Sequence, residues 1–233
     1  MDLKILGLWW NNMEHLLTAN VATNLYWFGR YLERIEATLL EVVYTFDEII
    51  DIDKDAGKKF YKNLGAEIEY DNAKEFLDVA IFGEHGSNLI HLMEFARENA
   101  IISRTNMYTE AFGSVIELAD LLKQGNNPAF TIDCRFIDHV LSLISEIWGE
   151  LTRRQKRNTS DYFIRLGKLV EKVDFHLRLG REKEFSLIVM DEIDTIVKIL
   201  APNAEFAPHD TNESHEVILN SINAKINKII VEE

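Results

Sequence analysis

Apolar side chains recur every three or four positions along most of this chain, with polar side chains between them. At about 100° of rotation per residue, this spacing collects the apolar side chains on one face of an α-helix. The three prolines stand at positions 128, 202 and 208, so no obligatory helix breaker interrupts the first 127 residues. Leucine, glutamate and lysine also favour helix. The pattern predicts an all-α helical bundle with several long helices.

Glycine, asparagine, serine and proline divide this pattern into segments, because these residues cap, stop or interrupt helices. The expected helices are about 16–50, 56–65, 72–82, 89–123, Thr131 or Asp133 to 157, a helix capped by Ser160, further helix to 200, and 215–230. The clearest loop is APNAEFAPHDTNES, at 201–214. We predict one domain over 1–233, because its 47% hydrophobic content suffices for one large helical core.

Two of these segments share one pattern, NLYWFGRYLERIEATLLEV at 24–42 and DYFIRLGKLVEKVDFHLRLG at 161–180. Setting Gly29 against Gly167 aligns their apolar and charged positions without a gap. Each copy then carries an apolar stripe, and a glycine and two acids lie along its flank: Gly29, Glu33 and Glu36 in the first copy, and Gly167, Glu171 and Asp174 in the second. Because glycine inside a helix costs roughly 1 kcal/mol relative to alanine, both glycines predict close approach by another helix or a ligand. The bundle is therefore expected to have two related halves.

Acids beside a core are partly desolvated and need cations, hydrogen bonds or a proton. Within the copies, the nearby cations are Arg30, Arg34, Lys168 and Lys172. FARENAIISR adds Arg97 and Arg104, which are seven residues apart and share a face if the helix is continuous. We therefore predict a polar network between helices that contains Glu33, Glu36, Arg97, Glu98, Arg104, Glu171 and Asp174.

Composition limits the classes of partner. The chain has 25 basic and 39 acidic side chains, a net charge of -14, which disfavours nucleic acids and anionic membranes. No apolar run approaches the ~18 residues that a membrane-spanning helix needs, so we expect a soluble chain. The single cysteine, Cys134, excludes an internal disulfide and fits a reducing compartment such as the cytoplasm.

At these residues the chain resembles the bacterial alpha-E domain family. NLYWFGRYLERIEA is similar to its opening signature, FARENA to its mid-chain segment, and FIRLGKLVEKVD to its second-half pattern. The three motifs occur in the expected order between positions 24 and 174. The chain departs from the family at Asn20, Lys168 and Lys172, where arginine is common. Lysine cannot reproduce the planar two-point grip of arginine on a carboxylate or phosphate.

The resemblance implies context rather than chemistry. Alpha-E proteins are typically encoded beside, or fused to, circularly permuted ATP-grasp proteins and transglutaminase-like proteases. It therefore implies these two protein classes as partners and a pathway that makes or trims amide or peptide bonds. This sequence has no glycine-rich phosphate loop. We accordingly expect no cofactor in this chain, and ATP bound by a partner if it is used.

Two function classes follow from these observations. The first is an accessory or scaffold component of an ATP-grasp-linked amide-bond-forming system, because buried ion pairs can fix helix register. The second is an enzyme of the same pathway, with Glu33 or Glu171 as general acid or base. Its candidate catalytic residues are Glu33, Glu36, Glu171 and Asp174, and its candidate substrate-binding residues are Arg30, Arg97, Arg104 and Lys168.

A carboxylate-bridged metal protein is a third, weaker hypothesis. The pairs Glu33/Glu36 and Glu171/Asp174 place acids at i and i+3 on two helices. Ferritin-like sites, however, need two Glu-x-x-His pairs. His176 comes two residues after Asp174 and so faces away from it. We therefore assign no metal ligand.

Overall fold

The fold was analysed in a computed structural model, which describes residues 17–126, 130, 132–153, 158–181, 183–203 and 214–231. Within these ranges the chain is helical and no strand occurs, so the all-α prediction is confirmed. The helices are α2 (Ala19–Asp51), α3 (Ala56–Asn63), α4 (Ala73–Phe82), α5 (Leu89–Ile102), α6 (Thr109–Lys123), α7 (Cys134–Thr152), α8 (Thr159–Arg178), α9 (Lys183–Leu200) and α10 (His215–Val231). In the part of the chain described, none of them has the length and apolar character required to cross a bilayer.

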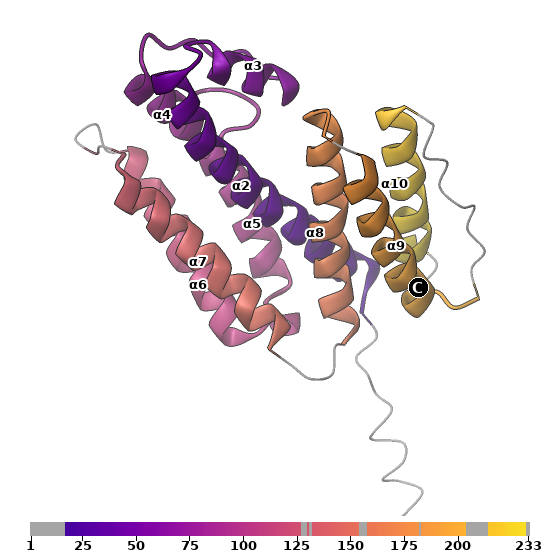
Figure 1. The fold of residues 1–233 in the computed structure, drawn as a ribbon. Coiled ribbons are helices and arrows are strands. Elements are labelled where there is room, and N and C mark those ends of the chain that lie inside the picture. Colours follow the sequence, from indigo (N-terminus) through magenta and orange to yellow (C-terminus); the bar gives the residue numbers. More distant parts are fainter. Residues whose placement is uncertain are drawn as a thin grey trace, which may run out of the picture.

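Helix α2 occupies the middle of the bundle. Figure 1 shows it between a group formed by α5, α6 and α7 and a group formed by α8, α9 and α10. Its most extensive partner is α8, the helix that holds the second copy of the motif. The predicted apolar stripe is fully buried at Phe28, Leu32, Ile35 and Leu39. The two copies therefore meet through the core of the protein.

Helix starts follow local side-chain chemistry. Asp133 accepts a hydrogen bond from the Phe136 amide at 2.8 Å, which confirms it as the cap of α7, whereas Thr131 lies outside the described residues. The predicted cap Ser160 of α8 is wrong. Asn158 accepts from the Asp161 amide at 3.0 Å, and the Asp161 carboxylate accepts from the Asn158 amide at 2.9 Å. This reciprocal capping box satisfies two helix-end donors, so the helix begins one residue after Asn158.

The predicted single helix over 89–123 is also wrong. Helix α5 ends at Ile102 and a 3₁₀ turn follows at Arg104–Asn106, before α6 begins at Thr109. The intervening sequence SRTNMYT is rich in serine, threonine and asparagine, whose side chains compete for backbone hydrogen bonds and so weaken helix. Arg104 therefore does not continue the helical face of Arg97. Helix α7 likewise ends at Thr152, before the predicted limit of 157, and residues 154–157 are not described.

Candidate functional site

Two glycines bring α2 and α8 into direct backbone contact. A Cβ at Gly29 would overlap the carbonyl oxygen of Ile164 and would lie 3.1 Å from the Lys168 amide nitrogen. A Cβ at Gly167 would overlap the carbonyl oxygen of Tyr26 and lie 2.9 Å from the Arg30 amide nitrogen. Each glycine thus admits the backbone of the other helix, as the sequence predicted.

The two helices run in the same direction from this crossing, because higher residue numbers on α2 face higher numbers on α8. Lys168 lies against Glu33, and further along Arg181 pairs with Glu41. Equivalent positions are therefore related by an approximate two-fold axis through the two glycines. The arginine or lysine side chains of each helix pair with the acids of the other helix, and this produces two charge clusters.

The first cluster, called here the arginine-side cluster, joins Arg30 and Arg34 of α2 to Glu171 and Asp174 of α8. Arg30 donates from Nε to Glu171 Oε2 at 2.8 Å and from Nη2 to Asp174 Oδ2 at 3.0 Å. Arg34 bonds the same two carboxylates, reaching Asp174 at 2.8 Å. Glu171 and Asp174 are 1% and 2% exposed. Two guanidinium groups therefore each bridge both buried acids, a strong and directional arrangement.

Asp174 receives further donors. Arg178 Nε donates to its Oδ1 at 2.7 Å, and His215 Nε2 of α10 lies 3.3 Å from the same oxygen. Burial raises the pKa of Asp174, but the Arg178 hydrogen bond and the charges of Arg34, Arg178 and Arg30 outweigh burial and hold this pKa below its ordinary value. Asp174 therefore remains ionised at neutral pH and is held by hydrogen bonds from three arginines.

The second cluster, called here the lysine-side cluster, contains Glu33 and Glu36 of α2 with Lys168 and Lys172 of α8. Lys168 Nζ lies 3.4 Å from Glu33 and 3.7 Å from Glu36, while Lys172 Nζ lies 3.8 Å from Glu33. The Trp148 indole N–H of α7 donates a hydrogen bond to Glu36 Oε2 at 2.8 Å. The Lys168 ammonium lies over the same indole ring, with its Nζ 3.7 Å from the ring centroid. The acids of this cluster are held mainly by charge.

Glu33 is the most perturbed acid of the lysine-side cluster. It is 5% exposed, and its buried Oε2 accepts no hydrogen bond from the described residues. Burial raises the pKa of Glu33 to about 7, against the lowering effect of the Lys168 and Lys172 charges. Burial also lowers the pKa of Lys168, against the charges of Glu33 and Glu36. Glu33 can therefore gain or lose a proton near neutral pH.

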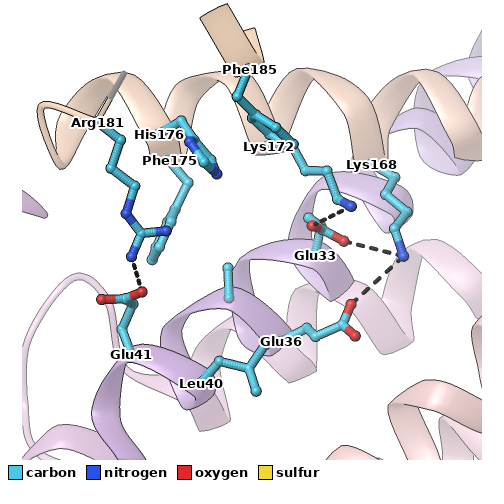
Figure 2. Close-up of a pocket in the computed structure, with 11 residues that line it drawn as sticks. Glu33, Glu36, Leu40, Glu41, Lys168, Lys172, Phe175, His176, Arg181 and Phe185 are labelled. Atoms are coloured by element: carbon cyan, nitrogen blue, oxygen red, sulfur yellow. Dashed lines mark hydrogen bonds and ion pairs between the residues drawn. The ribbon is translucent and has the colours of Figure 1, made fainter. Parts of the chain in front are cut away.

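A cavity of about 240 Å³ opens beside this cluster. Figure 2 shows Glu33 and Glu36 at one end with Lys168 and Lys172, and the Arg181–Glu41 ion pair at the other. Its residues come from α2, from α8 and from the α9 side: Glu33, Glu36, Ala37, Leu40, Glu41, Lys168, Lys172, Phe175, His176, Arg181 and Phe185. The cavity combines a charged end with apolar and aromatic walls, which is the usual composition of a ligand site.

Comparison with known protein families gives a match that includes both helices of the crossing. Residues 17–226 match the model of the Alpha-E family, described as a predicted alpha-helical domain with a conserved ER motif. The chain belongs to the Alpha-E family. No curated protein and no solved structure matches it.

The structure gives the Alpha-E motif a physical meaning. Glu33–Arg34 is the sole Glu-Arg dipeptide of the sequence. Its two side chains serve opposite clusters, because Glu33 contacts Lys168 and Lys172 whereas Arg34 bonds the acids of α8. One dipeptide of this Alpha-E chain therefore contributes to both charge clusters, on opposite sides of the helix crossing.

Most of the predicted site residues of this Alpha-E protein lie together. The crossing assembles Arg30, Glu33, Glu36, Lys168, Glu171 and Asp174. Arg97 and Arg104, predicted to bind substrate and to join the network, do not contact it. Arg97 pairs with its neighbour Glu98 at 3.4 Å, and the end of α5 carries Arg104 onto a separate 3₁₀ turn. The predicted network was wrong in Arg97, Glu98 and Arg104: the first two pair with each other on α5, and the helix break separates Arg104 from them.

Sequence reasoning missed four contributors to the Alpha-E crossing, namely Trp148, Arg178, Arg181 and His215. Arg178 carried a usable signal, since it stands four residues after Asp174 and shares its helix face. Trp148 and His215 arrive from other helices by tertiary packing, for which the motif contains no signal. Among the described residues, no group of three or more His, Cys, Asp or Glu side chains is arranged to hold a metal.

The raised pKa of Glu33 predicts a pH dependence of stability. Because folding raises this pKa from 4.5 to about 7, the folded state binds more protons between these values, and the free energy of unfolding falls as pH rises through this window. At about 1.4 kcal/mol per pKa unit, the expected contribution is about 3 kcal/mol. Urea unfolding of the wild type and of Glu33→Gln is measured at several pH values between 4.5 and 8. The difference between their free energies of unfolding at each pH gives the contribution of Glu33.

This subtraction is needed because other groups titrate. Folding lowers the pKa of His85 and of His176, so their contribution is lost as pH falls below 6.5 and opposes that of Glu33. Folding lowers the pKa of Asp174 below its ordinary value of 3.8, so its contribution to the free energy of unfolding changes at pH values below the window. A wild-type minus Glu33→Gln difference that stays constant across the window would contradict the assignment.

Proposed function

We propose that this Alpha-E protein is an accessory component of an ATP-grasp-linked amide- or peptide-bond-forming system, and that its cavity holds a small group for the partner enzyme. The class of system comes from the family resemblance, whose characteristic associates are ATP-grasp and transglutaminase-like proteins. The accessory role is supported by the contrast between the two charge clusters.

The single observation that carries this proposal is that the two equivalent charge clusters, on opposite sides of the α2–α8 crossing, differ in how their acids are held. The arginine-side cluster has its acids bridged by guanidinium groups and is built for packing. The lysine-side cluster has equivalent acids in loose ion pairs and borders a cavity. Since register is already fixed by the first cluster and by the glycine crossing, the second is available for binding.

A second candidate function is catalysis by this chain itself. Glu33 favours it, because a buried carboxyl with a pKa of about 7 can both accept and donate a proton at neutral pH. Lys168 and Lys172 are close enough to orient an anionic or polar reactant beside it. In this case Glu33 would act as general base for an amine or as general acid for a leaving group.

Reconstitution distinguishes the two candidates. The full chain is mixed with a circularly permuted ATP-grasp protein, the proposed partner, and ATP-dependent ligation is measured for each protein alone and for the mixture. We expect faster ligation by the mixture than by the ATP-grasp protein alone, and no turnover by the Alpha-E chain alone. Turnover by this chain alone would instead favour catalysis.

Two variants sharpen this experiment. Glu33→Gln is expected to lower the stimulation at least ten-fold while leaving co-purification with the partner intact, because it alters the cavity and not the outer surface. Glu117→Gln is the matched control, since Glu117 is an exposed glutamate of α6. The accessory proposal fails if the two proteins neither associate nor affect each other's rates.

A further inference from the structure

The two charge clusters differ in hydrogen-bond donors. Glu171 and Asp174 accept five hydrogen bonds from three arginines. Among the described residues, Glu33 and Glu36 together accept one, from Trp148. Glu33 Oε2 is buried and accepts no hydrogen bond within the described part of the chain, so the Lys168 ammonium at 3.4 Å offsets its desolvation through charge alone. The lysine-side cluster is therefore short of donors.

The approximate two-fold axis identifies what is missing. Adding 138 to a residue number of α2 gives the equivalent position of α8, as it does for Gly29 and Gly167. Arg178, whose guanidinium completes the arginine-side cluster, is thereby equivalent to Leu40. Leu40 lines the cavity and is 54% exposed. The first copy thus has a cavity and an apolar side chain where the second has a third cation.

The formal charges agree with this comparison. Three guanidinium groups face two carboxylates in the arginine-side cluster. Two ammonium groups face two carboxylates in the lysine-side cluster. Matching the charge of the arginine-side cluster would require one additional cation with several N–H donors in the first copy, positioned near Glu33 and Glu36.

We propose that the cavity binds the cationic head of a ligand, an ammonium or guanidinium group on a short alkyl stem, with Glu33 and Glu36 as its acceptors. Ala37, Leu40, Phe175 and Phe185 form the walls against which the stem packs. A volume of about 240 Å³ suits a group of the size of a lysine or arginine side chain. This inference rests on the proposed function, which assigns the cavity to a ligand, and names the ligand's chemical class.

The cations already present leave room for this ligand. Lys168 lies over the Trp148 ring and between the two acids, and Arg181 is paired with Glu41 at the far end of the cavity. His176 stacks on Phe185, and burial together with the charges of Arg181 and Lys172 lowers its pKa, so it is uncharged at neutral pH. Glu33 and Glu36 are therefore paired with ammonium groups at 3.4–3.8 Å, and their carboxylates can accept further N–H donors from a ligand.

Binding of n-butylguanidinium and n-butylammonium to the full-length chain tests the inference, with n-butyrate as the anionic control of equal stem length. Titration calorimetry and chemical-shift perturbation of the protein report affinity and location. At pH 8 we expect at least one of the cations to bind ten-fold or more tightly than butyrate. Comparison of the two cations distinguishes a guanidinium from an ammonium preference. Tighter binding of butyrate, or no binding of either cation at tens of millimolar, would overturn the inference.

Leu40→Arg is the sharpest variant, because it places the missing guanidinium on the protein itself. It is expected to reduce cation binding at least ten-fold while the helical circular dichroism stays unchanged. Val43→Arg adds the same charge at an exposed position of α2 that does not line the cavity, and should leave binding within about two-fold. Equal effects of the two variants would contradict the proposed location.

The ionisation of Glu33 supplies an independent readout. Because a cation prefers the ionised carboxylate, its affinity should rise about ten-fold between pH 6 and pH 8, and Glu33→Gln should remove this rise. Loss of cation binding with intact stimulation of the ATP-grasp protein would reject only the ligand class. Cation binding without any effect on that protein would instead reject the accessory role.

Discussion

Gly167→Ala is expected to lower the free energy of unfolding by about 3 kcal/mol or more, because the added methyl group would overlap the Tyr26 carbonyl oxygen. A backbone atom cannot move aside like the end of a flexible side chain, so α2 and α8 must separate. Gly29→Ala should have a similar effect through the Ile164 carbonyl. Urea unfolding followed by circular dichroism measures both.

Gly113→Ala is the matched control for these substitutions. Gly113 lies inside α6, and a Cβ added there would have no atom of a neighbouring helix within 4 Å. The same change should there raise the free energy of unfolding by about 0.5–1 kcal/mol, through lower chain entropy and better helix propensity. Similar shifts for Gly113→Ala and Gly167→Ala would show that the helix crossing is not under steric constraint.

Glu171→Gln is expected to destabilise the protein by about 3–5 kcal/mol, because it leaves the buried Arg30 and the half-buried Arg34 with Asp174 as their one remaining charged partner in this cluster. Arg30 has little access to water and cannot recover its hydration without disrupting the packing. Denaturant unfolding at pH 8 gives the magnitude, and a loss below 1 kcal/mol would contradict the structural role of the arginine-side cluster.

Glu33→Gln at the equivalent position is the control for Glu171→Gln. At pH 8 the wild-type Glu33 is ionised in a buried site with ammonium groups at 3.4 and 3.8 Å. Removing this charge relieves desolvation and should be nearly neutral or stabilising. The same chemical change is therefore expected to act differently in the two copies, and equal losses would contradict the division into a packing cluster and a binding cluster.

The helical periodicity and the internal repeat predicted the main features of the α2–α8 crossing, namely its glycine contact and its buried acids. The alignment of Gly29 with Gly167 correctly indicated a close approach, because glycine inside a helix has few other physical justifications. The acids at Glu33 and Glu171 were correctly placed beside the core, since helical geometry fixes a side chain's angle to the apolar stripe. These features depend on local rules alone.

Pairing across helices could not be predicted in the same way. Whether Arg34 bonds an acid of its own helix or Glu171 depends on the direction and register of two helices distant in the chain. Arg104 was misplaced because a change in helix propensity at Ser103 ended α5, whereas Arg97 stays inside α5 and pairs with Glu98. Trp148 approaches Glu36 from α7, and its role depends on how the whole bundle packs.

The cross-helix exchange of charges has the form of an isologous contact, in which a patch on one unit binds the same patch on another. Two identical chains would have to keep both ends of such a contact alike. Within one polypeptide the two ends are encoded separately, so arginine at one end and lysine at the other can be selected independently. Covalent linkage of the halves thus permits one end to specialise while the other preserves the assembly.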